Sequence, residues 1–255
     1  MGFYLFTAGG LSSTCYPARF EMNDFDEQHP QTIKAVVFDL GGVLIELHSD
    51  DATRELIEKY GLVPHTFARM TRSSFESHPR SVTELAIIGQ IGTAEYLDAL
   101  LQECGRKDLH ALKMNRLSVL GRERANVIAI AKELKSAGFI CCVLSNTIAL
   151  HWEKLSLRGE YPSLRLFEHV FASHLIKCAK PEDSAFVYVA AALKIPMSQC
   201  LLIDDTRLNV DRARAAGWQA LLFTDVTQLQ RDLDGLLQYR NSPRKNRLER
   251  STDCP

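Results

Sequence analysis

Five polar residues whose types suit phosphoryl chemistry stand at the ends of apolar segments or shortly after them. They are a carboxylate, a hydroxyl, an ammonium group and a pair of adjacent carboxylates: Asp39, Ser145, Lys180, Asp204 and Asp205. Carboxylate oxygens are ligands that Mg²⁺ prefers, while an ammonium group and a hydroxyl can offset the charge of a phosphate. A remaining carboxylate can then attack phosphorus in line. If the fold brings these side chains together, they predict Mg²⁺-assisted transfer of a phosphoryl group to an enzyme carboxylate.

Each of these residues also has a purely structural explanation. Aspartate suits the turn after a strand, and serine and aspartate suit helix N-termini. The dipeptide Lys180-Pro181 suits the first turn of a helix that follows a solvated lysine. Four such segments in one chain are harder to explain in this way, so the choice depends on whether the fold places them together.

An alternation of predicted strands and helices supplies a common edge for these segments. The apolar run Ala35–Phe38 leads into Asp39 and is followed by two glycines, which is typical of a buried strand. A further strand is expected ahead of Lys180, and the remaining predicted strands cover residues 139–144, 200–203 and 218–223. Helical periodicity between and after them, at residues 127–134, 186–193, 210–216 and 229–237, predicts crossover connections and a parallel sheet. The carboxyl ends of parallel strands share one edge, where open α/β sheets carry their chemistry.

The stretch between the first strand and residue 120 is helical, with no convincing strand. Breaks at Gly61 to Pro64 and at Gly89 to Gly92 divide it into four or five short helices. The first residues lack a clear period and the features of a secretory signal, and the last ones are basic and polar. The predicted division is a poorly ordered leader (1–31), a core (32–45 and 121–239), a helical insert (46–120) and a basic polar tail (240–255).

The composition of the chain argues against several classes of partner. Its 255 residues include 30 basic and 31 acidic ones, so a net charge of -1 favours neither nucleic acid nor a membrane surface. No apolar run approaches the roughly 20 residues that span a bilayer. The 7 cysteines are odd in number and several lie in apolar runs, which predicts reduced thiols in the cytoplasm. Cys141 and Cys142 are adjacent on a predicted strand and face opposite ways, which argues against zinc.

Between residues 34 and 237 the sequence resembles the haloacid dehalogenase superfamily, in particular the phosphatase branch of its subfamily I. The sugar-1-phosphate phosphatases of bacteria look similar, as do fungal phosphatases that act on terpenyl phosphates and, more distantly, the phosphatase domain of mammalian soluble epoxide hydrolase. The resemblance rests on the order and spacing of four motifs. They are Phe38-Asp39-Leu40-Gly41-Gly42-Val43-Leu44, Leu144-Ser145-Asn146-Thr147, Lys180-Pro181, and Ile203-Asp204-Asp205 with Asn209-Val210 and residues 213–217 following.

The resemblance implies an α/β fold, a Rossmann-like three-layer core around a parallel sheet, with the helical insert as a small cap that closes over the substrate. Asp39 would be the nucleophile that forms an aspartyl-phosphate, and Lys180 would be the second catalytic residue. The residues implied for binding the phosphoryl group are Ser145, Asn146 and Lys180. The ligands implied for Mg²⁺ are Asp39, the backbone carbonyl of Gly41 and Asp205, with Asp204 in support.

One departure from the family pattern concerns proton transfer. Phosphatases of this superfamily usually carry a second aspartate two residues after the nucleophile, where it protonates the leaving oxygen and then activates water. Here that position is Gly41. Such proton transfer typically contributes about 10²- to 10⁴-fold, so slow turnover or turnover restricted to good leaving groups is expected. Glu46, His48 or a residue of the cap are candidate replacements.

Three functions remain open on the sequence alone. The first is a Mg²⁺-dependent phosphatase of a small phosphorylated metabolite, of the sugar phosphate or prenyl and terpenyl phosphate class. The second is a catalytically impaired relative that binds phosphate without turnover because the second aspartate is missing. The third is a haloacid dehalogenase, which needs no metal and therefore leaves the Asp204-Asp205 pair without a role. The fold alone does not choose among them.

Overall fold

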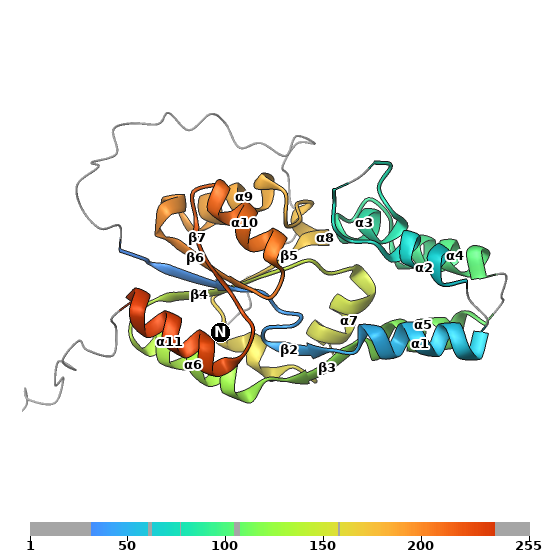
Figure 1. Cartoon of the computed structure of the whole chain (residues 1–255), viewed down its shortest axis with the longest axis horizontal. Helices are drawn as coiled ribbons and strands as arrows, with labels where there is room; N and C mark the ends of the chain where they lie inside the picture. The colour runs from blue at the N-terminus through green and yellow to red at the C-terminus, as the bar shows by residue number, and fades with distance from the viewer. Residues whose placement is uncertain (1–31, 61–62, 77, 105–107, 158, 238–255) are drawn as a thin grey trace, which may run out of the picture.

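Five short apolar segments form a parallel sheet in the computed structural model, which describes residues 32–60, 63–76, 78–104, 108–157 and 159–237. The strands are β1 (Ala35–Phe38), β4 (Ile140–Ser145), β5 (His169–Ala172), β6 (Cys200–Asp204) and β7 (Gln219–Leu222). Their order across the sheet is β5, β4, β1, β6, β7, and every neighbouring pair is parallel (Figure 1). The predicted parallel sheet is thereby confirmed, and β5 is the strand expected ahead of Lys180. The predicted leader and tail lie outside the described residues.

Helices cover both faces of the sheet and make the three layers that were predicted. On one face lie α6 (Ala125–Ser136) and α11 (Val226–Leu237), and on the other α9 (Asp183–Leu193) and α10 (Arg207–Ala215) (Figure 1). Successive strand residues alternate between the two faces. Cys141 packs with the first pair of helices and Cys142 with the second, as predicted for adjacent residues of one strand. Both thiols are buried and free. No helix of the described chain is long and apolar enough to cross a bilayer.

The insert consists of five helices in its described residues, within the four or five expected. They are α1 (Ser49–Tyr60), α2 (Pro64–Thr71), α3 (Val82–Ile87), α4 (Thr93–Cys104) and α5 (Leu109–Ser118). Their apolar residues, among them Leu56, Ile87 and Leu100, form a cluster that also takes in Ile148 and Ala179 from loops of the sheet domain. Ile148 directly precedes α7 (Ala149–Leu157), and Ala179 follows α8 (Ser173–Ile176). The insert thus packs against the core at these two loops. Its role as a separate cap stays a prediction.

Two short strands connect the insert to the core, and the expectation of no strand between residues 44 and 120 was wrong there. β2 (Ile45–Leu47) pairs antiparallel with β3 (Leu120–Glu123), so the insert is a long excursion between the two strands of one hairpin. Strands of three and four residues are too short to show a period. Their pairing is also nonlocal, and nothing in either segment alone reveals it.

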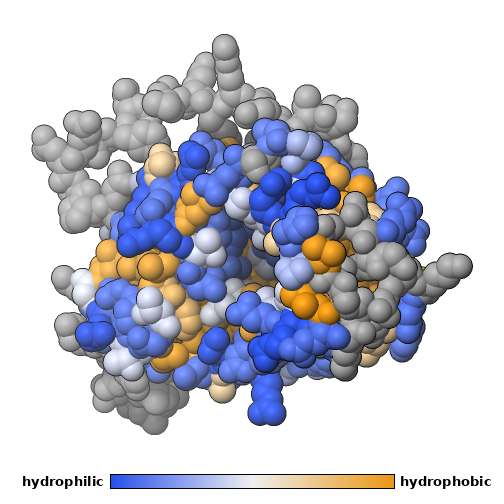
Figure 2. All heavy atoms as spheres, turned by 45° about the vertical axis from the view of Figure 1, so that its right-hand side comes forward, coloured by the Kyte–Doolittle hydropathy of each residue, from blue (hydrophilic) through white to orange (hydrophobic). Residues whose placement is uncertain are grey.

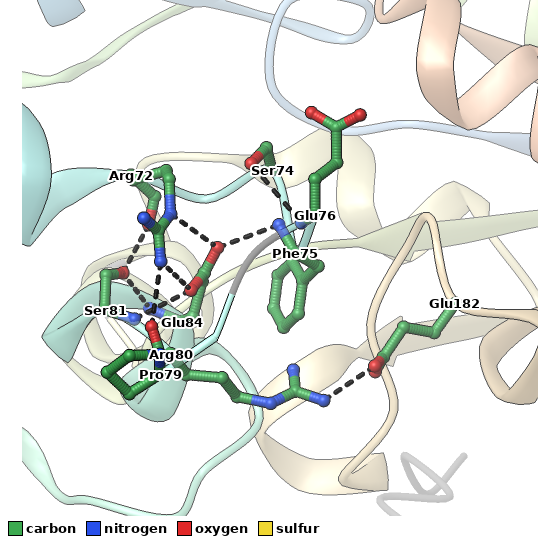
Figure 3. Close-up of polar contacts among 9 residues, drawn as sticks. All are labelled: Arg72, Ser74, Phe75, Glu76, Pro79, Arg80, Ser81, Glu84 and Glu182. Carbon is green, nitrogen blue, oxygen red and sulfur yellow. Dashed lines mark hydrogen bonds and ion pairs between the residues drawn. The ribbon is translucent and has the colours of Figure 1, made fainter.

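A buried glutamate organises the loop between α2 and α3 (Figure 3). The Glu84 carboxylate accepts hydrogen bonds from the backbone N–H groups of Phe75 (2.8 Å) and Ser81 (2.7 Å) and pairs with Arg72 at 3.4 Å. Phe75, whose N–H makes one of these hydrogen bonds, has a φ of 59°, a left-handed conformation that is costly for a bulky residue. Arg80, from the same loop, reaches Glu182 of the core at 2.6 Å. The insert is therefore tied to the core two residues after Lys180.

One face of the molecule has a mixed surface. Figure 2 shows a largely hydrophilic face with a hollow near its middle and hydrophobic surface to the left and right of it. Lys177 adds a second polar tie across the junction of insert and core, because its Nζ donates a hydrogen bond of 2.7 Å to the carbonyl of Gly89.

Candidate active site

The carboxyl ends of the three central strands bring the predicted polar residues to one place. Asp39 directly follows β1, Ser145 is the last residue of β4, and Asp204 is the last residue of β6. Because β4 and β6 flank β1 on its two sides, these residues lie at neighbouring strand ends. Lys180 and Asp205 arrive from the loops beyond β5 and β6.

Lys180 is the centre of this group. Its side chain is fully buried, and Nζ lies 2.6 Å from Oδ2 of Asp204 and 3.0 Å from Oδ1 of Asp39. Burial alone would lower the pKa of the ammonium group. The negative charges of Asp204 and Asp39 raise it by more than burial lowers it, so the net pKa lies above its ordinary value. Lys180 is therefore held in its charged form between two carboxylates.

Asp204 is held from several sides. While Oδ2 accepts the hydrogen bond from Lys180, Oδ1 accepts one from the backbone N–H of Thr206 at 2.9 Å and one from Nδ2 of Asn209 at 3.0 Å. A buried carboxylate is stable only with such partners. Asn209 was part of the fourth motif, but its role was not predicted. Its position in the first turn of α10, five residues after Asp204, is the signal that could have revealed it.

Asn146 contacts the backbone of Lys180. Its Nδ2 donates to the Lys180 carbonyl at 2.6 Å, and its Oδ1 accepts from the Lys180 N–H at 2.9 Å. This reciprocal pair fixes the segment that carries the ammonium group. Its predicted contact with substrate stays a prediction, as does that of Ser145, which is buried at the end of β4.

Three carboxylates of the site lie close enough to share a cation. Asp39, Asp204 and Asp205 each offer an oxygen, and these atoms lie within 4.8 Å of one another. Burial raises the pKa of Asp39 to about 8; the nearby charge of Lys180 lowers it, and those of Asp204 and Asp205 add to the rise. Burial and the neighbouring Asp204 also raise the pKa of Asp205, although its side chain reaches the surface. The charged forms of Asp39 and Asp205 are thus disfavoured by desolvation and by repulsion from the neighbouring carboxylates.

The two glycines after Asp39 have different local constraints. Gly42 has a φ of 83°, and a Cβ there would lie 1.9 Å from Oδ2 of Asp205, so only glycine fits. Gly41 is not among the residues with positive φ. The atoms nearest to a Cβ at Gly41 would belong to the flexible side chain of Leu47, with Cδ1 at 2.9 Å.

Glu46 and His48, which flank Leu47 in the sequence, lie beside Gly121. A Cβ at Gly121 would be 2.7 Å from Nε2 of His48 and 2.8 Å from Cβ of Glu46, so both residues border β3. Glu46 is also 3.8 Å from the guanidinium group of Arg124. The structure therefore places Leu47 over Gly41, and the two candidate replacements for the missing aspartate beside Gly121.

The sequence matches the haloacid dehalogenase-like hydrolase family over residues 33–217. This match spans most of the chain, so the chain belongs to that family and is a hydrolase. The family assignment agrees with the fold, in which helices flank a parallel sheet on both faces.

Two curated relatives have names from terpenoid chemistry. Sesquiterpene phosphatase astK of Aspergillus oryzae is 24% identical over 195 residues, which cover 76% of this chain and 91% of that protein. Drimenol cyclase drtB of Aspergillus calidoustus is 30% identical over 93 residues, which cover 36% of this chain and only 17% of that protein.

Solved structures of the family share the fold. A HAD family enzyme from Bacteroides thetaiotaomicron, in complex with magnesium and inorganic phosphate, superposes with a TM-score of 0.65 at 22% identity, covering 77% of this chain and 98% of that one. A HAD-like family hydrolase from Porphyromonas gingivalis has the same TM-score at 22% identity, with coverages of 79% and 98%. The L-2-haloacid dehalogenase RSc1362 follows at 0.59 and 17%, with coverages of 81% and 99%. At these identities the likeness establishes the fold alone.

Proposed function

We propose that this hydrolase is a Mg²⁺-dependent phosphatase of a small phosphorylated metabolite and acts through an aspartyl-phosphate on Asp39. The observation that carries the proposal is the fully buried Lys180, held between Asp39 and Asp204 with Asp205 beside them. A carboxylate, a fixed ammonium group and a second pair of carboxylates are what phosphoryl transfer to an aspartate requires.

The donor set fits Mg²⁺. Asp39, Asp205 and the backbone carbonyl of Gly41 would hold the ion, since hard oxygen ligands suit it. Asp204 would support the site from behind, because Lys180, Thr206 and Asn209 already occupy its oxygens. When bound, Mg²⁺ offsets the negative charge of the carboxylates and of the phosphate.

The side chains of the chain have distinct roles in the proposed reaction. An oxygen of Asp39 attacks phosphorus while the bond between phosphorus and the leaving oxygen breaks. Lys180, with Ser145 and Asn146 at the end of β4, faces the charge on the remaining phosphoryl oxygens. Water then attacks phosphorus of the aspartyl-phosphate, which restores the Asp39 carboxylate and releases inorganic phosphate.

The relatives favour one of the two substrate classes considered. The match to a sesquiterpene phosphatase covers most of that protein, which supports a prenyl or terpenyl phosphate over a sugar phosphate. The buried free cysteines of the described chain, such as Cys178 and Cys200, support a reducing, cytoplasmic location.

A substrate screen with and without metal tests the proposed function. We expect inorganic phosphate to be released from one or more of farnesyl phosphate, hexose phosphates and acetyl phosphate, in millimolar Mg²⁺ and not in EDTA. Asp205→Asn should lose activity more completely than Asp204→Asn, because only Asp205 is proposed as a direct ligand. Chloride release from chloroacetate without metal would identify a dehalogenase instead. Phosphate binding without any turnover would identify the catalytically impaired relative. Gly41, in place of the usual second aspartate, is the feature that favours this alternative.

Replacing Lys180 by alanine should weaken the binding of phosphate and vanadate by about 10-fold or more, since an ammonium group facing a dianion is removed. Inhibition constants for vanadate in the parent and the variant give the measurement. Lys177→Ala is the matched control, because that lysine contacts Gly89 instead of the carboxylates. Equal inhibition of Lys180→Ala and the parent would remove Lys180 from the phosphate site.

A further inference from the structure

The hairpin that carries the insert presents an apolar side chain to the candidate site. Leu47 is 43% exposed, and its Cδ1 and Cδ2 atoms lie 2.9 and 3.2 Å from the place that a Cβ at Gly41 would take. Side chains alternate along a strand, which explains why Glu46 lies beside Gly121 instead. A leucine thus fills the space of the side chain that would stand two residues after the nucleophile.

Leu47 also borders an open cleft beside the carboxylates. The cleft has a volume of about 560 Å³, and its wall includes Gly42 and Asp205. Leu47, Phe223 and Val226 make the apolar part of the wall. Arg124 and Asn126, two residues of the loop after β7 and Thr227 of α11 make the polar part. A ligand whose phosphate is bound beside Asp205 therefore has Leu47 on the wall of the same cleft.

In-line displacement decides which part of the substrate meets this leucine. The leaving oxygen stands opposite the attacking oxygen of Asp39, on the far side of phosphorus from the strand end. A sugar at that place would lose hydrogen bonds to water, and Leu47 offers none in return. A hydrocarbon there gains binding free energy, because its apolar surface is removed from water.

We propose that Leu47 is a specificity-determining residue that selects phosphate esters of hydrocarbon alcohols over those of sugars. The inference rests on the proposed function and names the substrate class of that same site. In the reaction the bond between phosphorus and the leaving oxygen breaks, and that oxygen takes its proton from water. A single exposed leucine is ordinary on protein surfaces, but this one lies over the turn that follows the candidate nucleophile.

The test compares n-alkyl phosphates from ethyl to octyl with glucose 6-phosphate on the full chain. For the parent, kcat/KM should rise by about 2- to 4-fold per methylene over the first methylenes, and glucose 6-phosphate should be a poorer substrate than hexyl phosphate. Leu47→Asn has a similar size but a polar end, and it should lower the octyl-to-ethyl ratio of kcat/KM by about 10-fold. Leu47→Met should keep the ratio, because its side chain stays apolar.

Leu236→Asn is the matched control, since Leu236 is also an exposed leucine but lies outside the cleft. Its octyl-to-ethyl ratio should equal that of the parent. An unchanged ratio in Leu47→Asn, or a parent that prefers glucose 6-phosphate, would overturn the proposal.

A binding measurement separates failure of this inference from failure of the proposed function. Calorimetry with ethyl- to octylphosphonate, which are not hydrolysed, gives the dependence of Kd on chain length even if no phosphatase activity is found. Tightening with chain length in the parent and its loss in Leu47→Asn support the role of Leu47. Equal chain-length dependence in the two proteins rejects that role, whatever the screen for turnover shows.

Discussion

Asp39→Asn should reduce turnover of every phosphorylated substrate by at least about 100-fold and leave the fold intact. The amide is nearly isosteric with the carboxylate but is a poor nucleophile, so the step that forms the aspartyl-phosphate is lost. Lys180 keeps its 2.6 Å contact with Asp204 as a structural partner. Release of inorganic phosphate under saturating substrate gives the measurement.

The control for this variant is Asp98→Asn, because Asp98 is an exposed aspartate on α4 of the insert. It should behave as the parent does. Thermal unfolding of both variants shows whether any loss reflects the fold. Retention of more than about one per cent of the parental activity by a folded Asp39→Asn protein would remove Asp39 from the role of nucleophile.

Gly41→Asp should raise the rate on unactivated alkyl phosphates such as hexose 6-phosphates, by up to the roughly 10²- to 10⁴-fold of a positioned acid. Activated substrates such as acetyl phosphate should gain much less, because protonation helps most when the leaving oxygen is strongly basic. The backbone permits the change, since Gly41 lacks the positive φ of Gly42. The nearest obstacle to the new side chain is the flexible end of Leu47.

Two companion variants separate the acid from its steric effect. Gly41→Asn fills the same space without an acidic proton and should not raise the rate on alkyl phosphates. Gly41→Asp combined with Leu47→Ala relieves the contact and should gain at least as much as Gly41→Asp alone. A folded Gly41→Asp protein with the parental ratio of alkyl to activated rates would show that another group already supplies the proton. The argument from Gly41 about leaving groups would then fail.

The sequence predicted the parts of the fold that depend on local pattern. The strands β1, β4 and β6 are continuous apolar runs. Their alternation with helices predicted that the strands of the sheet are parallel. The hairpin of β2 and β3 was missed because its strands are short and pair across the whole insert. The strand expected ahead of Lys180 was predicted without bounds, because the four residues of β5 are too few to show a period.

Within the site, the sequence predicted which residues gather at the strand ends but not how they hold one another. The pairing of the Asn146 amide with the Lys180 backbone joins segments 34 residues apart. The position of Leu47 over Gly41 depends on the hairpin that was missed. Contacts of this kind follow from tertiary packing and leave no period in the chain.

Trapping of the intermediate tests the central claim most directly. During turnover of acetyl phosphate with Mg²⁺, borohydride should reduce the aspartyl-phosphate to an alcohol, which converts Asp39 to homoserine in the peptide that contains it. We predict this mass change at position 39 in the parent protein and its absence in Asp39→Asn. An unmodified Asp39 in a protein that is releasing phosphate, or homoserine at a different aspartate, would contradict the account.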